Sequence, residues 1–142
     1  MRIDARLWFC IYCLFSMIIA FMFPWVLSDR NTFLKDFMNH EFLSFMGVVV
    51  TITLASTANI NISLKRKEEE AGEEFLEGTR GKVKQSAFSL ILAMFLSVLL
   101  VVTKPLLPTI DEFLALANAV GLGIILWGLL IILDITRLAF KI

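Results

Sequence analysis

Residues 42–64 read FLSFMGVVVTITLASTANINISL and contain no charged side chain. A helix that crosses the hydrocarbon core of a bilayer, about 30 Å thick, needs about 20 predominantly apolar residues, because lipid offers its backbone no hydrogen-bond partner. This stretch meets that requirement, and so do residues 7–27, 84–103 and 113–133. The sequence therefore predicts an all-α fold, an integral membrane four-helix bundle that forms a single transmembrane domain over residues 1–142.

The composition of the whole chain is that of a membrane protein. Hydrophobic residues make up 58% of the 142 residues, charged residues make up 18%, and the mean hydropathy is +0.83. Soluble domains are typically about 45–50% apolar and about 25% charged. Thirteen Phe and three Trp against three Pro and seven Gly exclude a disordered chain. The formal net charge is +0, so we expect no direct binding of nucleic acid.

The distribution of Lys and Arg predicts the orientation. Short loops rich in Lys and Arg stay in the cytoplasm. Most of these residues fall near the two termini and within 65–84, whereas the segments 28–41 and 104–112 contain only Arg30, Lys35 and Lys104. We therefore expect a multi-pass protein of the cell inner membrane, with both termini and a helical hairpin at 65–83 in the cytoplasm.

The first span has an alternative interpretation as a cleaved signal peptide, because Arg2 and Arg6 precede an apolar run. The run is longer than the apolar part of a usual signal peptide and lacks a small-x-small cleavage site. Trp8 and Trp25 near its two ends indicate the interfacial anchoring of a retained helix. We expect the last helical turn to accommodate Pro24.

Enzyme motifs are absent, so we expect no catalysis, no cofactor and no metal. Cys10 and Cys13 form a C-x-x-C within an apolar helix, where two thiols alone do not complete a tetrahedral zinc site. We expect them to behave as small apolar side chains, with reversible acylation as the alternative. The single His40 is interpreted as a solvated loop residue, and Asp134 with Arg137 as an ion pair one turn apart.

Polar side chains gather on two sides of the second span. One side carries Thr51, Ala55, Asn59 and Ser63, and the other carries Thr53, Thr57 and Asn61. Because lipid cannot suit both sides, we expect this helix to be central in the bundle. Its polar groups form either hydrogen bonds between helices or a water-lined path in an oligomer. We assign Thr53, Thr57, Asn59 and Asn61 to oligomer-facing or pore-facing positions.

Small residues follow two ridges of the fourth span. Ala115, Ala119 and Gly123 lie on one ridge, and Ala117 and Gly121 lie on the next. Small residues allow close helix contact in membranes. We assign Ala117 and Gly121 to contacts between subunits, and we expect a homo-oligomer with a tetramer favoured.

The hairpin between the second and third spans has basic flanks and an acidic tip. Good helix formers from Lys65 to Ala71 predict that the second span continues as a helix up to Gly72, while Gly78 and Gly81 would allow the chain to return. The tip is either a solvated turn or a docking site for a cytosolic protein effector with a basic surface. The candidate partner-binding residues are Glu68, Glu69, Glu70, Glu73, Glu74, Phe75, Leu76 and Glu77.

The chain resembles the small four-span membrane subunits of bacterial anti-phage defence systems, in particular the membrane subunit of the Kiwa system. The resemblance covers the whole chain as a profile of size and spans, and it includes the segment 54–70, which passes from the membrane into the cytosol. It implies a membrane sensor and scaffold that works with a soluble, nucleic-acid-binding effector. The alternative function is a holin-like or effector pore lined by copies of the second span. A transporter is disfavoured because no span carries a charge near its middle.

Overall fold

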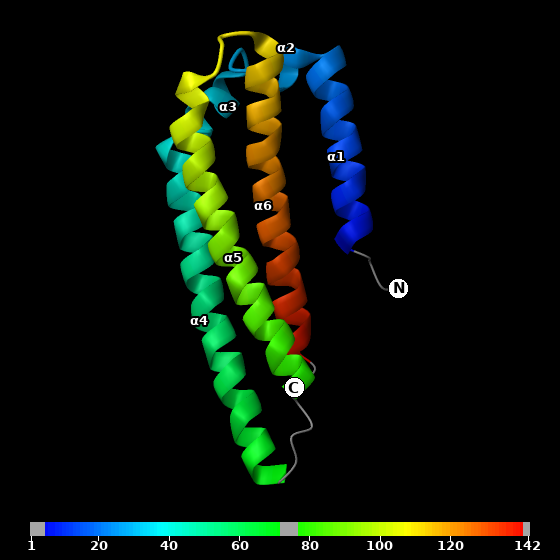
Figure 1. Ribbon diagram of the computed structural model, residues 1–142, viewed down its shortest axis with the longest axis vertical. Helices are drawn as coiled ribbons and strands as arrows, with labels where there is room; N and C mark the ends of the chain where they lie inside the picture. The colour runs from blue at the N-terminus through cyan, green and yellow to red at the C-terminus, as the bar shows by residue number, and fades with distance from the viewer. Residues whose placement is uncertain (1–4, 72–76, 141–142) are drawn as a thin grey trace.

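The computed structural model describes residues 5–71 and 77–140, and within these two ranges the regular structure is entirely helical. In chain order the elements are α1 (Ala5–Met22), α2 (Pro24–Leu27), α3 (Thr32–Phe37), α4 (His40–Ala71), α5 (Glu77–Thr103), a 3-10 turn (Lys104–Leu106) and α6 (Asp111–Ala139). The long helices run side by side, and the short elements close one end of the bundle (Figure 1). The predicted all-α class is confirmed.

Among the residues that the structure describes, three helical segments are long and apolar enough to cross a membrane: His40–Glu69, Gly78–Leu106 and Asp111–Ala139. Large apolar side chains also cover the outside of the bundle, where Phe88 is 70% exposed and Leu14 is 66% exposed. A soluble protein would bury such side chains, whereas lipid accepts them. The chain therefore has the character of a multi-pass membrane protein.

The first predicted span is not one continuous helix. α1 ends at Met22, Phe23 leaves the helical region with φ −135° and ψ 59°, and Pro24 begins the short helix α2. Proline has no backbone N–H, and its ring disfavours helical geometry in the residue before it. The expectation that the last turn would accommodate Pro24 was therefore wrong, and the continuous apolar helix here is Leu7–Met22.

The second and third predicted spans are longer in the structure than their apolar runs. α4 continues to Ala71, which confirms that the charged residues after the second span extend its helix. α5 begins at Glu77, so Gly78 and Gly81 lie inside a helix, and the expectation that they form the returning turn was wrong. A glycine costs about 1 kcal/mol in a helix relative to alanine, a cost that the packing of α5 on α4 outweighs.

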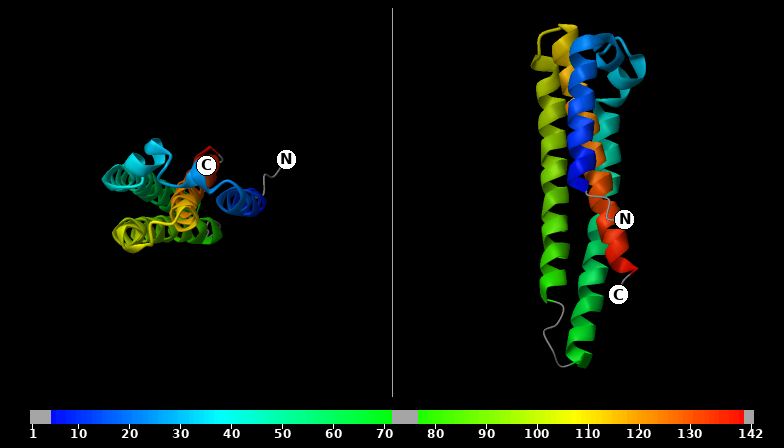
Figure 2. Two further views of the ribbon diagram at one scale, coloured as in Figure 1. Left: turned by 90° about the horizontal axis from the view of Figure 1, so that it is seen from above. Right: turned by 90° about the vertical axis from the view of Figure 1, so that its right-hand side faces the viewer.

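The central helix is α6, not the helix of the second span as expected. In Figure 2, seen from above, α6 stands between α1 on one side and α4 and α5 on the other. Of the residues in the most apolar 18-residue stretch of α6, 44% are buried, against 22% in the corresponding stretch of α4 and 17% in that of α5. The expectation about the second span was wrong because the polar hydroxyl groups of α4 find partners within their own helix.

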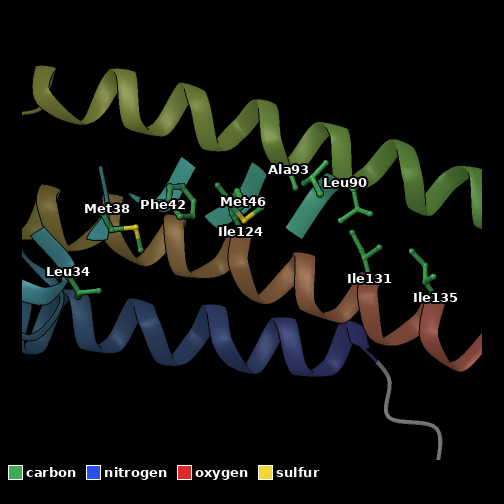
Figure 3. Close-up of a cluster of buried hydrophobic side chains, with 10 residues drawn as sticks. Leu34, Met38, Phe42, Met46, Leu90, Ala93, Ile124, Ile131 and Ile135 are labelled. Carbon is green, nitrogen blue, oxygen red and sulfur yellow. The ribbon is translucent and has the colours of Figure 1, made fainter. Parts of the chain in front are cut away.

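The apolar core lies where α4, α5 and α6 meet (Figure 3). Phe42 and Met46 of α4 are fully buried there, together with Leu90 of α5 and Ile124 of α6. Met38, which follows α3, is 1% exposed and closes this core at the end that carries the short helices.

The two ridges of small residues on α6 contact different parts of the same chain. A Cβ atom added at Gly121 would lie 2.6 Å from Met38 Sδ and 3.1 Å from Leu100 Cδ2. A Cβ atom added at Gly123 would lie 3.1 Å from the Tyr12 ring. Both ridges therefore allow close approach within one subunit, which explains the central position of α6.

Candidate functional site

An arginine clamp joins α4 and α5 near the end where the chain carries most of its basic residues. Arg80 Nε donates to Asn61 Oδ1 over 3.3 Å, and Arg80 Nη1 pairs with Glu68 Oε2 at 2.8 Å. Asn61 and Glu68 are seven residues apart, so they lie on the same face of α4. The side chains of Arg80 and Glu68 are only 28% and 11% exposed, so water screens this ion pair less than it would a surface pair. The clamp fixes the spacing of the two helices beyond their apolar parts.

The candidate partner-binding residues fall into three groups. Glu68 belongs to the clamp, whereas Glu69 is exposed and pairs with Lys65 at 3.6 Å. Glu70 and Glu77 lie in α4 and α5, but their side chains are outside the described residues. Glu73, Glu74, Phe75 and Leu76 also lie outside the described residues. Of these eight candidates, Glu69 is the one whose side chain is described and exposed.

The hydroxyl groups of α4 bond to the backbone of their own helix. Thr53 and Thr57 are buried within the subunit, and they donate to the carbonyl oxygens of Val49 and Thr53 over 2.6 and 2.7 Å. The exposed Thr51 does the same toward Gly47 over 2.8 Å. Bonds to the carbonyl four residues earlier satisfy a hydroxyl without a second helix. These threonines therefore create little demand for an outside partner.

The other residues assigned to oligomer contacts are divided between the inside and the outside of the subunit. Ala117 and Gly121 are buried by neighbouring helices of the same chain, and Asn61 belongs to the clamp. Asn59 is exposed on α4 and faces away from the bundle. Asn59 is thus the assigned residue that the structure leaves open to another copy.

A second polar cluster closes the opposite end of the bundle. Lys104 Nζ pairs with Asp29 Oδ1 at 2.8 Å, and Asn118 Nδ2 donates to the same carboxylate oxygen over 3.1 Å and to the Leu27 carbonyl oxygen over 2.7 Å. Asn118 is fully buried, and its Oδ1 has no hydrogen-bond partner among the described residues. Lys104 is buried as well, with 7% of its side chain exposed. The cluster ties the loop after α2 to the start of α6.

The charges of this cluster stabilise one another. Burial of Asp29 disfavours its charged form, but the hydrogen bonds from Lys104 and Asn118 outweigh that effect, and the pKa of Asp29 is lowered from 3.8. Arg30 and Asp111 form a more exposed pair beside it, at 2.8 Å. The loop is therefore attached to the bundle by two ion pairs.

This polar cluster was not predicted from the sequence. Lys104 was used only as one of the few basic residues outside the termini and 65–84, and Asn118 was not considered, although it is the single amide side chain within 113–133. An isolated amide in an apolar span requires a hydrogen-bond partner, so this signal was present in the sequence. Its partners could not be read, because Asp29 is 89 residues away along the chain.

The remaining chemistry-bearing residues are dispersed. Cys10 and Cys13 are free and exposed. Within 5–71 and 77–140, no group of three His, Cys, Asp or Glu residues is arranged to hold a metal ion. Asp134 and Arg137 are both exposed and form no ion pair with each other, so the expected pair was wrong.

No protein-family model, curated protein or solved structure matches this chain.

Proposed function

We propose that this chain is a four-span membrane scaffold whose cytoplasmic hairpin recruits a soluble protein effector. α1 is the fourth span: its 18 residues extend about 27 Å, close to the thickness of the hydrocarbon core. The exposed Trp8 and Trp25 suit the two interfaces. The abundance of Lys and Arg near the clamp favours a cytoplasmic location for that end and for both termini.

The observation that carries this proposal is the projection of α4. Its 32 residues extend about 48 Å, and Figure 1 shows it reaching beyond α5 and α6 at the end opposite to α2. The clamp joins Arg80 of α5 to Glu68 near the end of α4. Lys65 and Glu69 of α4 and Lys82 and Lys84 of α5 are exposed around it. Helix ends that are held together lose little conformational entropy when a protein binds them, which favours docking.

Recruitment is tested by co-purification of the tagged chain with the soluble protein encoded by the neighbouring gene. Phe75→Ala combined with Leu76→Ala should lower capture about tenfold, because each anchor buries a large apolar side chain. Reversal of Glu73, Glu74 and Glu77 to Lys should weaken binding and reduce its salt dependence. Ile62→Ala, at an exposed site within the second apolar run, is the matched control and should capture normally. Equal capture by all variants would mean that the tip is a solvated turn.

The same proposal includes a homo-oligomer, with a tetramer favoured, that contacts through α4. Thr51, Asn59 and Ser63 are exposed along this helix. An amide such as Asn59 is poorly accommodated by lipid and gains from a partner in another copy. Asn59→Leu should reduce the oligomer seen by native mass measurement in nanodiscs, whereas Thr51→Val should not. A monomer in the unaltered protein would exclude the oligomer.

A conducting pore is the second candidate, and the same exposed polar face of α4 favours it. Copies of α4 that turn this face toward a common axis would line a path with amide and hydroxyl groups. Expression of the chain alone distinguishes the two functions. A scaffold leaves the membrane potential unchanged, whereas a pore collapses it, and Asn59→Leu should then restore it.

The anti-phage role is proposed from the resemblance described above. A strain that carries this chain and its neighbouring gene should reduce phage plating, and the double variant at Phe75 and Leu76 should abolish that protection while the chain remains in the membrane.

A further inference from the structure

α1 contacts the rest of the bundle along a narrow line on α6. The Tyr12 hydroxyl donates to the Ala119 carbonyl oxygen over 2.6 Å, and the Tyr12 ring covers Gly123. Figure 2 shows α1 on the far side of α6 from α4 and α5, so α1 has no second long helix behind it. Large apolar side chains on both flanks of α1 remain exposed, among them Leu14 at 66% and Phe15 at 62%.

A groove of about 430 Å³ opens on one flank of this contact. Trp8, Ile11 and Phe15 form its α1 wall, and Leu126, Leu130 and Leu133 form its α6 wall. The volume lies within the usual range of ligand sites, about 300–1,000 Å³. Because apolar side chains form both walls, the groove suits an apolar occupant such as an acyl chain.

Two charged side chains stand at one end of the same groove. Asp134 and Arg137 belong to its lining, lie one turn apart on α6 and are both exposed. They form no ion pair with each other and follow directly after the apolar part of α6. Trp8 lines the same end, and tryptophan prefers the boundary between hydrocarbon and headgroups. The charged mouth therefore lies at the level of the cytoplasmic headgroups.

The charges at the mouth determine which headgroup fits. A guanidinium group binds phosphate with directed hydrogen bonds, so Arg137 suits the phosphate of a phospholipid. Asp134, one turn away, repels a purely anionic headgroup but accepts an ammonium group. A headgroup with both a phosphate and an ammonium satisfies both side chains.

We propose that this groove is a binding site for a zwitterionic phospholipid of the phosphatidylethanolamine type. One acyl chain lies between α1 and α6, the phosphate contacts Arg137, and the ammonium contacts Asp134. The lipid supplies the packing that α1 lacks on this flank. The proposal rests on the membrane placement of the chain and not on its scaffold role, so a failure to capture an effector would leave it unaffected.

The test is native mass spectrometry of the purified chain with phosphatidylethanolamine or phosphatidylglycerol of matched acyl chains. The unaltered protein should retain one phosphatidylethanolamine per subunit and bind phosphatidylglycerol more weakly. Arg137→Gln, at an exposed site, should weaken retention about tenfold or more, since it removes a charged hydrogen-bond donor. Asp134→Asn should remove the preference between the two lipids.

Filling the groove tests the acyl-chain site. Leu130→Trp should eliminate the retained lipid, whereas Leu129→Trp, on the exposed face of the same helix, should leave it in place. The proposal is overturned if the unaltered protein retains no lipid, if it prefers phosphatidylglycerol, or if Arg137→Gln and Leu130→Trp both retain lipid normally. A change in oligomer mass without lipid loss in Leu130→Trp would assign the groove to a second copy of the chain, which also overturns it.

Discussion

The Tyr12 hydroxyl donates a hydrogen bond of 2.6 Å to the Ala119 carbonyl oxygen and thereby joins α1 to α6. The two residues are 107 positions apart, and the contact depends on the small residues of α6, because Gly123 leaves room for the Tyr12 ring. A side chain at Gly123 would push the ring away and lengthen the bond. Attachment of the first helix therefore requires one phenol and one site without a side chain.

Tyr12→Phe should loosen α1 while leaving its ring packed. Hydrogen bonds between membrane helices contribute about 0.6 kcal/mol on average, up to about 1.7 kcal/mol, so we expect a loss of stability in that range. Thermal unfolding in detergent measures it. Ser16→Ala, which removes a bond within α1 itself, is the control and should cost less. An unchanged melting temperature in Tyr12→Phe would show that ring packing alone holds α1.

Gly121→Ala should destabilise the subunit, and Gly128→Ala should not. A Cβ atom at Gly121 collides with Met38, which is 1% exposed and cannot move aside freely, so a cost of about 1–3 kcal/mol is expected. At Gly128 the nearest neighbour would be Met46 Cε at 3.9 Å, and alanine improves helix propensity by up to about 1 kcal/mol. Melting temperatures of the two variants should move in opposite directions. Equal shifts would show that Met38 adapts.

The pair of Asp29 and Lys104 should make the outer loop sensitive to acid. Because the pKa of Asp29 is lowered in the folded state, its contribution is present above the unfolded value near 3.8 and is lost as pH falls through the folded value. Asp29→Asn should lower the free energy of unfolding by on the order of 2 kcal/mol at neutral pH, because it leaves the buried Lys104 without its partner. This value lies between the costs of breaking a surface ion pair and a fully buried one.

The matching measurement is thermal unfolding of the two proteins from pH 7 to pH 3. The difference between the unaltered protein and Asp29→Asn should shrink below about pH 4. The double variant Asp29→Asn with Lys104→Met should recover part of the loss, since no buried charge then remains unpaired. A pH-independent difference would contradict the assigned role of this ion pair.

Arg80→Gln should separate the ends of α4 and α5 without unfolding the apolar core. The clamp is the charged contact that holds Glu68 and Asn61 to α5. Its removal leaves the nearly buried Glu68 carboxylate without its cationic partner. Hydrogen exchange should accelerate at 65–69 and 78–84 and remain unchanged near Phe42 and Leu90. Lys84→Gln, an exposed neighbour, is the control. Uniform acceleration of hydrogen exchange along both helices would contradict a local role of the clamp.

The sequence predicts helix content and length far better than it predicts which faces meet. The apolar runs and the helix formers of 65–71 identify α4 correctly, because lipid and backbone hydrogen bonding constrain each span independently. In a soluble bundle the apolar face indicates the inside. Here the lipid-facing side is equally apolar, so the small residues and Asn118 of α6 indicate close contacts without identifying the helices that α6 meets. Tyr12 with Ala119, and Asn118 with Asp29, were inaccessible for the same reason.

The prediction of the candidate site residues has the same limit. Local rules identified the acidic candidates and the polar positions of α4, yet the neighbours of those residues decide what remains available. Glu68 is held by Arg80, which depends on the relative rotation of α4 and α5. The Thr57 hydroxyl is instead satisfied by the backbone of its own helix. Asn59 and Glu69 are exposed because no helix within the described parts of the chain covers those faces.

The attachment of α1 to α6 joins two residues that are synthesised at different times. Tyr12 leaves the ribosome 107 residues before its acceptor, an interval on the order of 5–20 s at ordinary rates of synthesis. During that time α1 has no α6 to pack on, and the Tyr12 hydroxyl lacks its Ala119 acceptor. α1 therefore packs on a helix that is made long after it, and its environment before docking consists of the surrounding lipids and insertion machinery.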